Sequence, residues 1–91
     1  MDHRIEIDFH ASEGAILRLV GLVERRGFEV LGMTLPHMDA TQPAHMGLTV
    51  RPRDDSRRLA VLEAQLRRIH GVSDVRHGAA NDPDLRYEAA S

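Results

Sequence analysis

The sequence predicts an α+β fold, in which a four-stranded antiparallel sheet carries two helices on one of its faces. Two observations lead to this fold class. Residues 4–9 alternate between charged and apolar side chains, which is the period of a strand with one face in water. Residues 15–26 and 59–69 instead have the apolar spacing of amphipathic helices.

The loop before the first helix contains the residues that a tight turn needs. Ser12 or Glu13 is expected to accept hydrogen bonds from the free amides at the helix start. Gly14 lets the backbone turn sharply and approach a ligand, because it carries no Cβ. At the other end, Arg25 suits the negative pole of the helix, and Gly27 is expected to adopt the left-handed conformation that ends it.

The rest of the chain continues as strand, loop, strand, helix and strand, at residues 28–35, 37–44, 46–50, 59–69 and 72–77. The second helix has one apolar stripe, made by Leu59, Leu62, Leu66 and Ile69. Asp54, Asp55 or Ser56 is expected to cap it. With 91 residues and no flexible linker, we expect one domain in residues 1–78 and a flexible C-terminal tail in residues 79–91.

This order of elements, with right-handed crossovers, gives the ferredoxin-like βαββαβ arrangement with the spatial strand order 4-1-3-2. The outward positions of the first and third strands are polar, as in a sheet that is covered on one side only. They are Glu6, Asp8, Thr49 and Arg51.

The second strand is expected at an edge of this sheet, although both of its alternating sets of side chains are largely apolar. The two sets are Phe28, Val30, Gly32 and Thr34 on one side and Leu31, Met33 and Leu35 on the other. An apolar edge without lysine favours pairing with a second copy, although burial inside the monomer is an alternative. We therefore expect a homodimer interface at Leu31, Met33, Leu35 and Gly21, the last being a mid-helix glycine that indicates close packing on the sheet or on a partner helix.

Composition excludes several classes of function. The chain has no cysteine, so disulfides and thiolate metal sites are impossible, and no segment resembles a signal peptide or a membrane span. We expect a cytoplasmic protein. A net charge of −2 is atypical of nucleic-acid binding, and the strand positions where RNA-binding domains of this fold carry aromatic side chains hold acids, Gly47 and Thr49. The sequence offers no nucleophile, metal cage or acid pair, so we do not expect an enzyme.

The loop and helix just described resemble an ACT domain, and more closely the small regulatory subunit of acetolactate synthase. The resemblance runs from about Arg4 to His77, and the segment RLVGLVERRGF at residues 18–28 is the most specific part. Some members of that family carry a second domain after the ACT domain. This chain has no room for one and so resembles the short, isozyme II type of subunit.

The resemblance implies a regulatory protein without cofactors of its own. It would form a homodimer and bind a large catalytic subunit, which uses thiamine diphosphate, magnesium and FAD to condense pyruvate for branched-chain amino acid synthesis. An amino-acid effector would lie between the first loop of one copy and the second strand of the other. The effector-binding residues would be Ala11, Ser12, Glu13, Gly14 and Ala15, with Glu29, Val30 and Leu31 across the interface. Valine-sensitive relatives carry Asn at the positions of Ala11 and Glu29, so we expect little or no response to valine.

Alternative interpretations stay open at this point. Gly14 is also the residue that a strand-to-helix turn requires without any effector. His10, His37 and His45 are expected near one end of the sheet, as solvent-facing side chains rather than a metal site. The pairs Arg51/Arg53, Arg57/Arg58 and Arg67/Arg68 indicate solvated faces, or docking to an acidic partner. A free-standing amino-acid sensor and a ligand-free dimerisation module are the other functions that the sequence allows.

Overall fold

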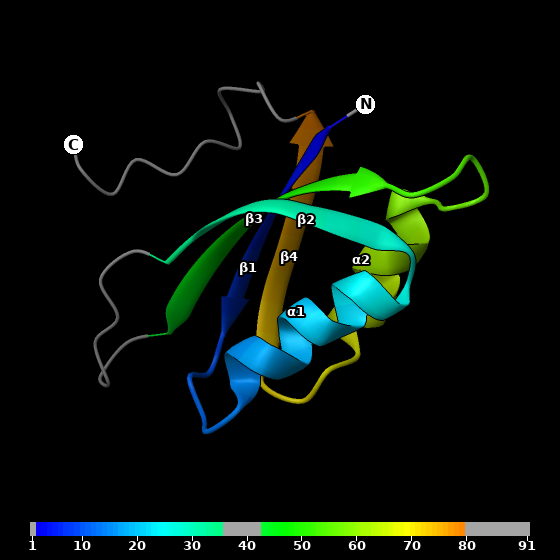
Figure 1. The fold of residues 1–91 in the computed structure, drawn as a ribbon. Coiled ribbons are helices and arrows are strands. Elements are labelled where there is room, and N and C mark those ends of the chain that lie inside the picture. Colours follow the sequence, from blue (N-terminus) through cyan, green and yellow to red (C-terminus); the bar gives the residue numbers. More distant parts are fainter. Residues whose placement is uncertain (1, 36–42, 80–91) are drawn as a thin grey trace.

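The computed structural model describes residues 2–35 and 43–79, which form the predicted order of elements (Figure 1). The strands are β1 (His3–Phe9), β2 (Phe28–Thr34), β3 (Ala44–Pro52) and β4 (Val72–Ala79), and the helices are α1 (Ala15–Arg25) and α2 (Leu59–Arg67). The predicted loop at 37–44 and tail at 79–91 lie mostly outside the described residues. Their described ends correct the prediction, because Ala44 belongs to β3 and Ala79 to β4.

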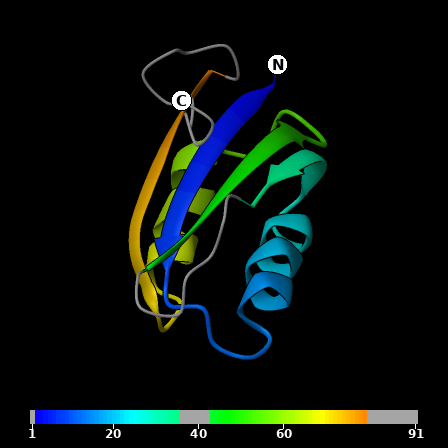
Figure 2. The same ribbon diagram turned by 90° about the vertical axis from the view of Figure 1, so that its left-hand side faces the viewer.

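The four strands form one antiparallel sheet with the order β2-β3-β1-β4, which is the predicted order read from the other edge (Figure 2). Both helices lie on one side of this sheet, and Figure 2 shows α2 behind the strands and α1 beside them, below β2. Helix α1 packs against β2, helix α2 packs against β4, and the two helices touch. In the described residues, neither helix has the length and apolar character needed to cross a membrane.

The core lies between the helices and the sheet, and the alternation of apolar side chains places it there. Ile5, Ile7 and Phe9 of β1 are buried, as predicted from their spacing. The predicted stripe of the second helix also faces this core, with Leu62 and Leu66 fully buried and both ends of the stripe partly buried. Each buried side chain of this size contributes about 1.5–3 kcal/mol to folding.

The prediction of side-chain caps was wrong at both helix starts. Helix α1 begins after Gly14, whose backbone is left-handed (φ 78°), and no described side chain caps it. Helix α2 begins after Arg58 in extended conformation, also without a cap among the described side chains. Asp54 instead accepts a hydrogen bond from the Ser56 amide at 2.9 Å, which closes a turn ahead of the helix. The prediction for the end of α1 is confirmed, since Gly27 has a φ of 89°.

A β-bulge interrupts β2 and corrects the predicted alternation of this strand. Val30 lies opposite Val50 of β3, but Gly32 lies opposite Thr49, so Leu31 is an extra residue in the ladder. A bulge of one residue exchanges the two faces of the strand beyond it.

Beyond the bulge, the members of each predicted set therefore change to the other face of the sheet. Met33 is opposite the buried Leu48 and points to the helix side of the sheet. Thr34 is on the open face, where its hydroxyl accepts a hydrogen bond from Arg4 at 3.2 Å. Before the bulge, Phe28 and Val30 also belong to the helix side, so apolar residues from both predicted sets meet there.

Candidate functional site

The loop between β1 and α1 lines a pocket of about 250 Å³ at one end of the molecule. The lining comes from the end of β1, the loop and the first turn of α1: Phe9, Ala11, Ser12, Gly14, Ala15, Ile16 and Leu17. Four of the five predicted effector residues in this loop are therefore brought together. The fifth, Glu13, is exposed and does not line the pocket.

Arg18 supports this loop, a role that the sequence prediction missed. Its guanidinium donates to the Glu13 carbonyl and to the Ser12 hydroxyl, both at 3.1 Å. A Cβ on Gly14 would lie 3.0 Å from Arg18 Nη1, so the glycine leaves room for this side chain as well as supplying the left-handed turn. An arginine four residues after the turn glycine, on the same side of the helix, is the signal that could have revealed it.

The predicted residues of β2 do not line the loop pocket of their own chain. Helix α1, about 16 Å long with its eleven residues, separates the pocket at its start from the beginning of β2, where Glu29, Val30 and Leu31 lie. One chain therefore does not combine the two halves of the predicted site. Glu29 is exposed and pairs in register with Arg51, a cation that partly offsets the repulsion between the Glu29 carboxylate and the carboxylate of an amino-acid ligand.

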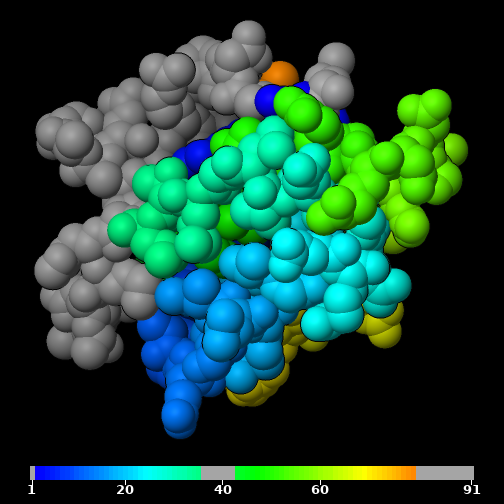
Figure 3. Space-filling model, viewed as in Figure 1, coloured from blue at the N-terminus to red at the C-terminus, as the bar shows by residue number. Residues whose placement is uncertain are grey.

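Large apolar side chains are exposed on α1 and β2, which lie next to each other on the face drawn in Figure 3. Leu17 is 78 % exposed, Met33 51 %, and Leu31 and Leu35 40 % each. The side chains of Leu31, Met33 and Leu35 are thus not buried inside the monomer, which was the alternative for the second strand. A Cβ on Gly21 would meet only the Arg25 guanidinium, at 3.1 Å, so packing on the sheet does not explain this glycine.

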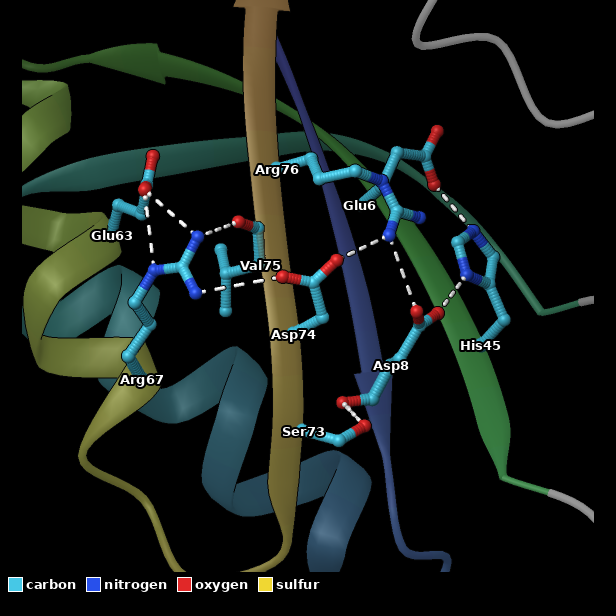
Figure 4. A network of polar contacts seen from close by, with 9 residues as sticks. All are labelled: Glu6, Asp8, His45, Glu63, Arg67, Ser73, Asp74, Val75 and Arg76. Carbon is cyan, nitrogen blue, oxygen red and sulfur yellow. Dashed lines mark hydrogen bonds and ion pairs between the residues drawn. The ribbon is translucent and has the colours of Figure 1, made fainter.

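The open face of the sheet carries a polar network that sequence reasoning did not find (Figure 4). Glu6, expected in water, is only 2 % exposed. His45 lies between two carboxylates, with Nε2 2.6 Å from Glu6 and Nδ1 2.7 Å from Asp8. Both ring nitrogens of His45 therefore lie within hydrogen-bond distance of a carboxyl oxygen, one on each neighbouring position of β1 that faces the open side.

Two further arginines complete this network. Arg4 Nε donates to Glu6 at 2.8 Å and its guanidinium lies over Gly47, where a Cβ would be 2.1 Å from Nη2. Arg76 donates to Asp8 at 3.2 Å. Burial raises the pKa of Asp8, but the hydrogen bonds from His45 and Arg76 outweigh this effect, and the net result is a lowered pKa.

The described histidines do not form a metal site. No group of three or more potential metal ligands occurs within residues 2–35 and 43–79. His10 is exposed, as predicted, whereas the prediction of a solvent-facing side chain was wrong for His45, which is bonded to two carboxylates. His37 lies outside the described residues.

Comparison with known proteins assigns the family. The family profile described as "ACT domain" matches residues 11–75, which run from the loop pocket to the middle of β4. The chain belongs to the ACT domain family. Among curated proteins, no sequence matches this ACT chain.

Solved structures show the same ACT fold in proteins of different kinds. The ACT domain of GTP pyrophosphokinase from Chlorobium tepidum is 18 % identical with a TM-score of 0.69, over 85 % of this chain and 96 % of that one. The acetolactate synthase small subunit from Thermotoga maritima is 19 % identical with a TM-score of 0.71, over 92 % of this chain and 50 % of that one. A formyltetrahydrofolate deformylase from Pseudomonas putida KT2440 is 13 % identical with a TM-score of 0.72, over 90 % and 30 %.

These similarities establish the fold and leave the finer function open. The ACT chain spans half of the Thermotoga subunit and less than a third of the deformylase. The same fold therefore occurs in proteins of different kinds, and the surface residues of each domain determine what it binds.

Proposed function

We propose that this ACT domain acts as a homodimer, paired through β2 and α1. The support is the separation of the two halves of the predicted effector site, because residues 29–31 do not line the loop pocket of their own chain. A second copy related by a two-fold axis brings the β2 of one chain to the loop of the other. The same pairing covers the exposed Leu17 and Met33 and gives the helix at Gly21 a close neighbour.

An amino acid is the effector class that this site supports best. The pocket of one copy offers an apolar wall and the hydroxyl of Ser12, while residues 29–31 of the other copy would close it. Ala11 has no polar side chain to meet the charged ends of a zwitterion. We therefore expect the chain as it stands to respond weakly to valine, or not at all.

The partner we propose is the catalytic subunit of an acetolactate synthase. The support is the segment at residues 18–28, which resembles the small regulatory subunits of that enzyme, together with the shared fold of the Thermotoga subunit. Thiamine diphosphate, magnesium and FAD would belong to the catalytic subunit, and this chain would bring no cofactor. Its effect would come from binding one state of the partner better than another.

Acetolactate formation from pyruvate tests this assignment. The catalytic subunit from the same organism is assayed with and without the chain, and size exclusion follows complex formation. We expect a higher turnover and a complex. Arg58→Glu is expected to weaken activation if the α2 start is a docking face, with Arg68→Glu as a control at the other end of the same helix.

A free-standing amino-acid sensor is the alternative, and the variety of proteins that share this fold supports it. An identical rate and no complex in the acetolactate assay would favour it over the regulatory subunit. A screen of the twenty amino acids by calorimetry then separates the sensor from the third possibility, a dimerisation module without a ligand.

A further inference from the structure

A second pocket, of about 160 Å³, lies at the opposite end of α1 from the loop pocket. Its polar lining consists of Arg26 at the end of α1 and of Ser56, Arg57 and Arg58 before α2. Phe28, Val61 and Leu62 of β2 and α2 form its apolar lining, in which Val61 is the exposed side chain. Neither the sequence prediction nor the proposed function assigns a ligand to this pocket.

The side chain of Arg57 lies over the backbone of Gly27. A Cβ on Gly27 would lie 2.2 Å from Arg57 Nε, so this side chain occupies the space that the glycine leaves. The Arg53 amide donates to the Gly27 carbonyl at 2.9 Å and joins the two loops. The glycine therefore brings the Arg57 side chain close to the end of α1, where Arg26 also lies.

The positive charges of the pocket are only partly neutralised. Arg57 Nε lies 3.5 Å from Asp54, whose carboxylate also accepts two hydrogen bonds from Ser56. Arg26 donates to the neutral Gln65 at 3.2 Å. Arg58 has no side-chain partner among the residues that the structure describes. Cations grouped beside an apolar lining suit a ligand that has an anionic end and an apolar body.

We propose that this pocket binds a small organic anion, whose carboxylate or phosphate group meets the guanidinium groups while a short apolar body lies on Val61. Val61 is 52 % exposed in the free chain, and a ligand of this kind would remove its side chain from water. The volume allows a body of a few carbon atoms. This proposal does not depend on the acetolactate synthase assignment.

Titration of the isotope-labelled chain with five probes tests the proposal. The probes are isobutyrate, isobutyl phosphate, acetate, inorganic phosphate and the neutral isobutyramide. Nuclear magnetic resonance follows the amides of Gly27, Arg57 and Val61. We expect saturable shifts at these amides, with isobutyrate or isobutyl phosphate bound about tenfold more tightly than the matching bare anion and with isobutyramide silent.

Two variants and a matched control sharpen this test. Arg57→Ala and Arg58→Ala are each expected to weaken binding about tenfold, since each removes a charge-assisted hydrogen bond. Arg68→Ala removes an exposed arginine of α2 outside the pocket and is expected to leave binding unchanged. If Arg57→Ala fails to fold, Arg58→Ala decides alone.

Three results would overturn the proposal. They are equal binding of bare and apolar anions, equal binding of isobutyramide, or shifts confined to residues outside the pocket. Silence of every probe at tens of millimolar, together with weaker binding of Arg58→Glu to the catalytic subunit, would assign the arginines to an acidic protein surface instead.

Discussion

Strands β2 and β4 are the two edges of one sheet, but their outer sides differ in chemistry. On β4, Arg67 reaches from α2 and donates to the Val75 carbonyl, while Asp74 and Arg76 form an ion pair at 2.6 Å (Figure 4). Strand β2 instead carries exposed apolar side chains, those of Leu31 and Met33. Charged side chains and blocked carbonyls prevent strand addition, and apolar edges invite it.

Helix α1 and strand β2, which pack against each other, carry exposed apolar side chains and the glycine in mid-helix, and the loop pocket lies at the start of α1. Helix α2 and strand β4, which also pack against each other, carry salt bridges. This difference places the proposed dimer interface on the side of α1 and β2.

The largest effect is expected from a charge at the β2 edge. Met33→Glu and Leu31→Glu each place an acid where the dimer would exclude water, at a cost of several kcal/mol. We expect the dimer to dissociate about a hundredfold more readily, measured as mass by light scattering over a dilution series. Ser73→Glu at the β4 edge is the matched control and should leave the mass unchanged. An unchanged dimer in both β2 variants would move the interface elsewhere.

The next effect concerns the stability of the open face. Glu6→Ala removes the buried carboxylate and leaves Arg4 and His45 without it, which is expected to lower the free energy of unfolding by about 3 kcal/mol. Urea unfolding measures the change, and Glu24→Ala, at an exposed position of α1, should change stability by less than about 0.5 kcal/mol. Equal losses in the two variants would mean that the network contributes no more than an ordinary surface charge.

We expect valine binding to be gained when one residue of the loop before α1 and one residue of β2 are substituted together. Ala11→Asn with Glu29→Asn supplies two amides, each able to hydrogen-bond to an end of valine. Calorimetry is expected to show valine affinity at least about tenfold above that of the unchanged chain. Each single variant serves as a control and should give a smaller gain. Tight binding of valine by the unchanged chain would show that these two positions do not control the effector.

The smallest effect is a pH dependence on the β4 side. Because the folded state lowers the pKa of Asp8 below its ordinary value of 3.8, its ionised form stabilises the fold above that pH. This contribution is lost as the pH falls below 3.8 and through the lower folded pKa. We expect Asp8→Asn to cost less than about 1 kcal/mol at neutral pH and nothing in strong acid, by thermal unfolding across pH. A cost that stays constant on acidification would contradict this origin.

The sequence predicted the fold because the relevant patterns are local and repeated. Alternation in residues 4–9 and the leucine stripe of the second helix each set one face toward the core, and these faces determine the packing. The positive φ of Gly27 was likewise predictable from its place after a helix.

The errors in the sheet arose where contacts across strands decide the outcome, and the error at the start of α1 arose from a contact within the loop. The bulge at Leu31 depends on the register with β3, which no pattern inside β2 reveals. Glu6 is buried because Arg4 and His45 cover it, and His45 comes from another strand. At Gly14, the left-handed turn and Arg18 replaced the expected side-chain cap.

Hydrogen exchange of the two sheet edges tests the central claim most directly. The outward amides of β2 and of β4 are compared in the unchanged chain over a range of protein concentrations. We expect protection of β2, from Gly32 to Thr34, to rise with concentration while that of β4 stays constant. Exchange at both edges that is independent of concentration, or protection that rises at β4 instead, would contradict the assignment of β2 as the dimer edge.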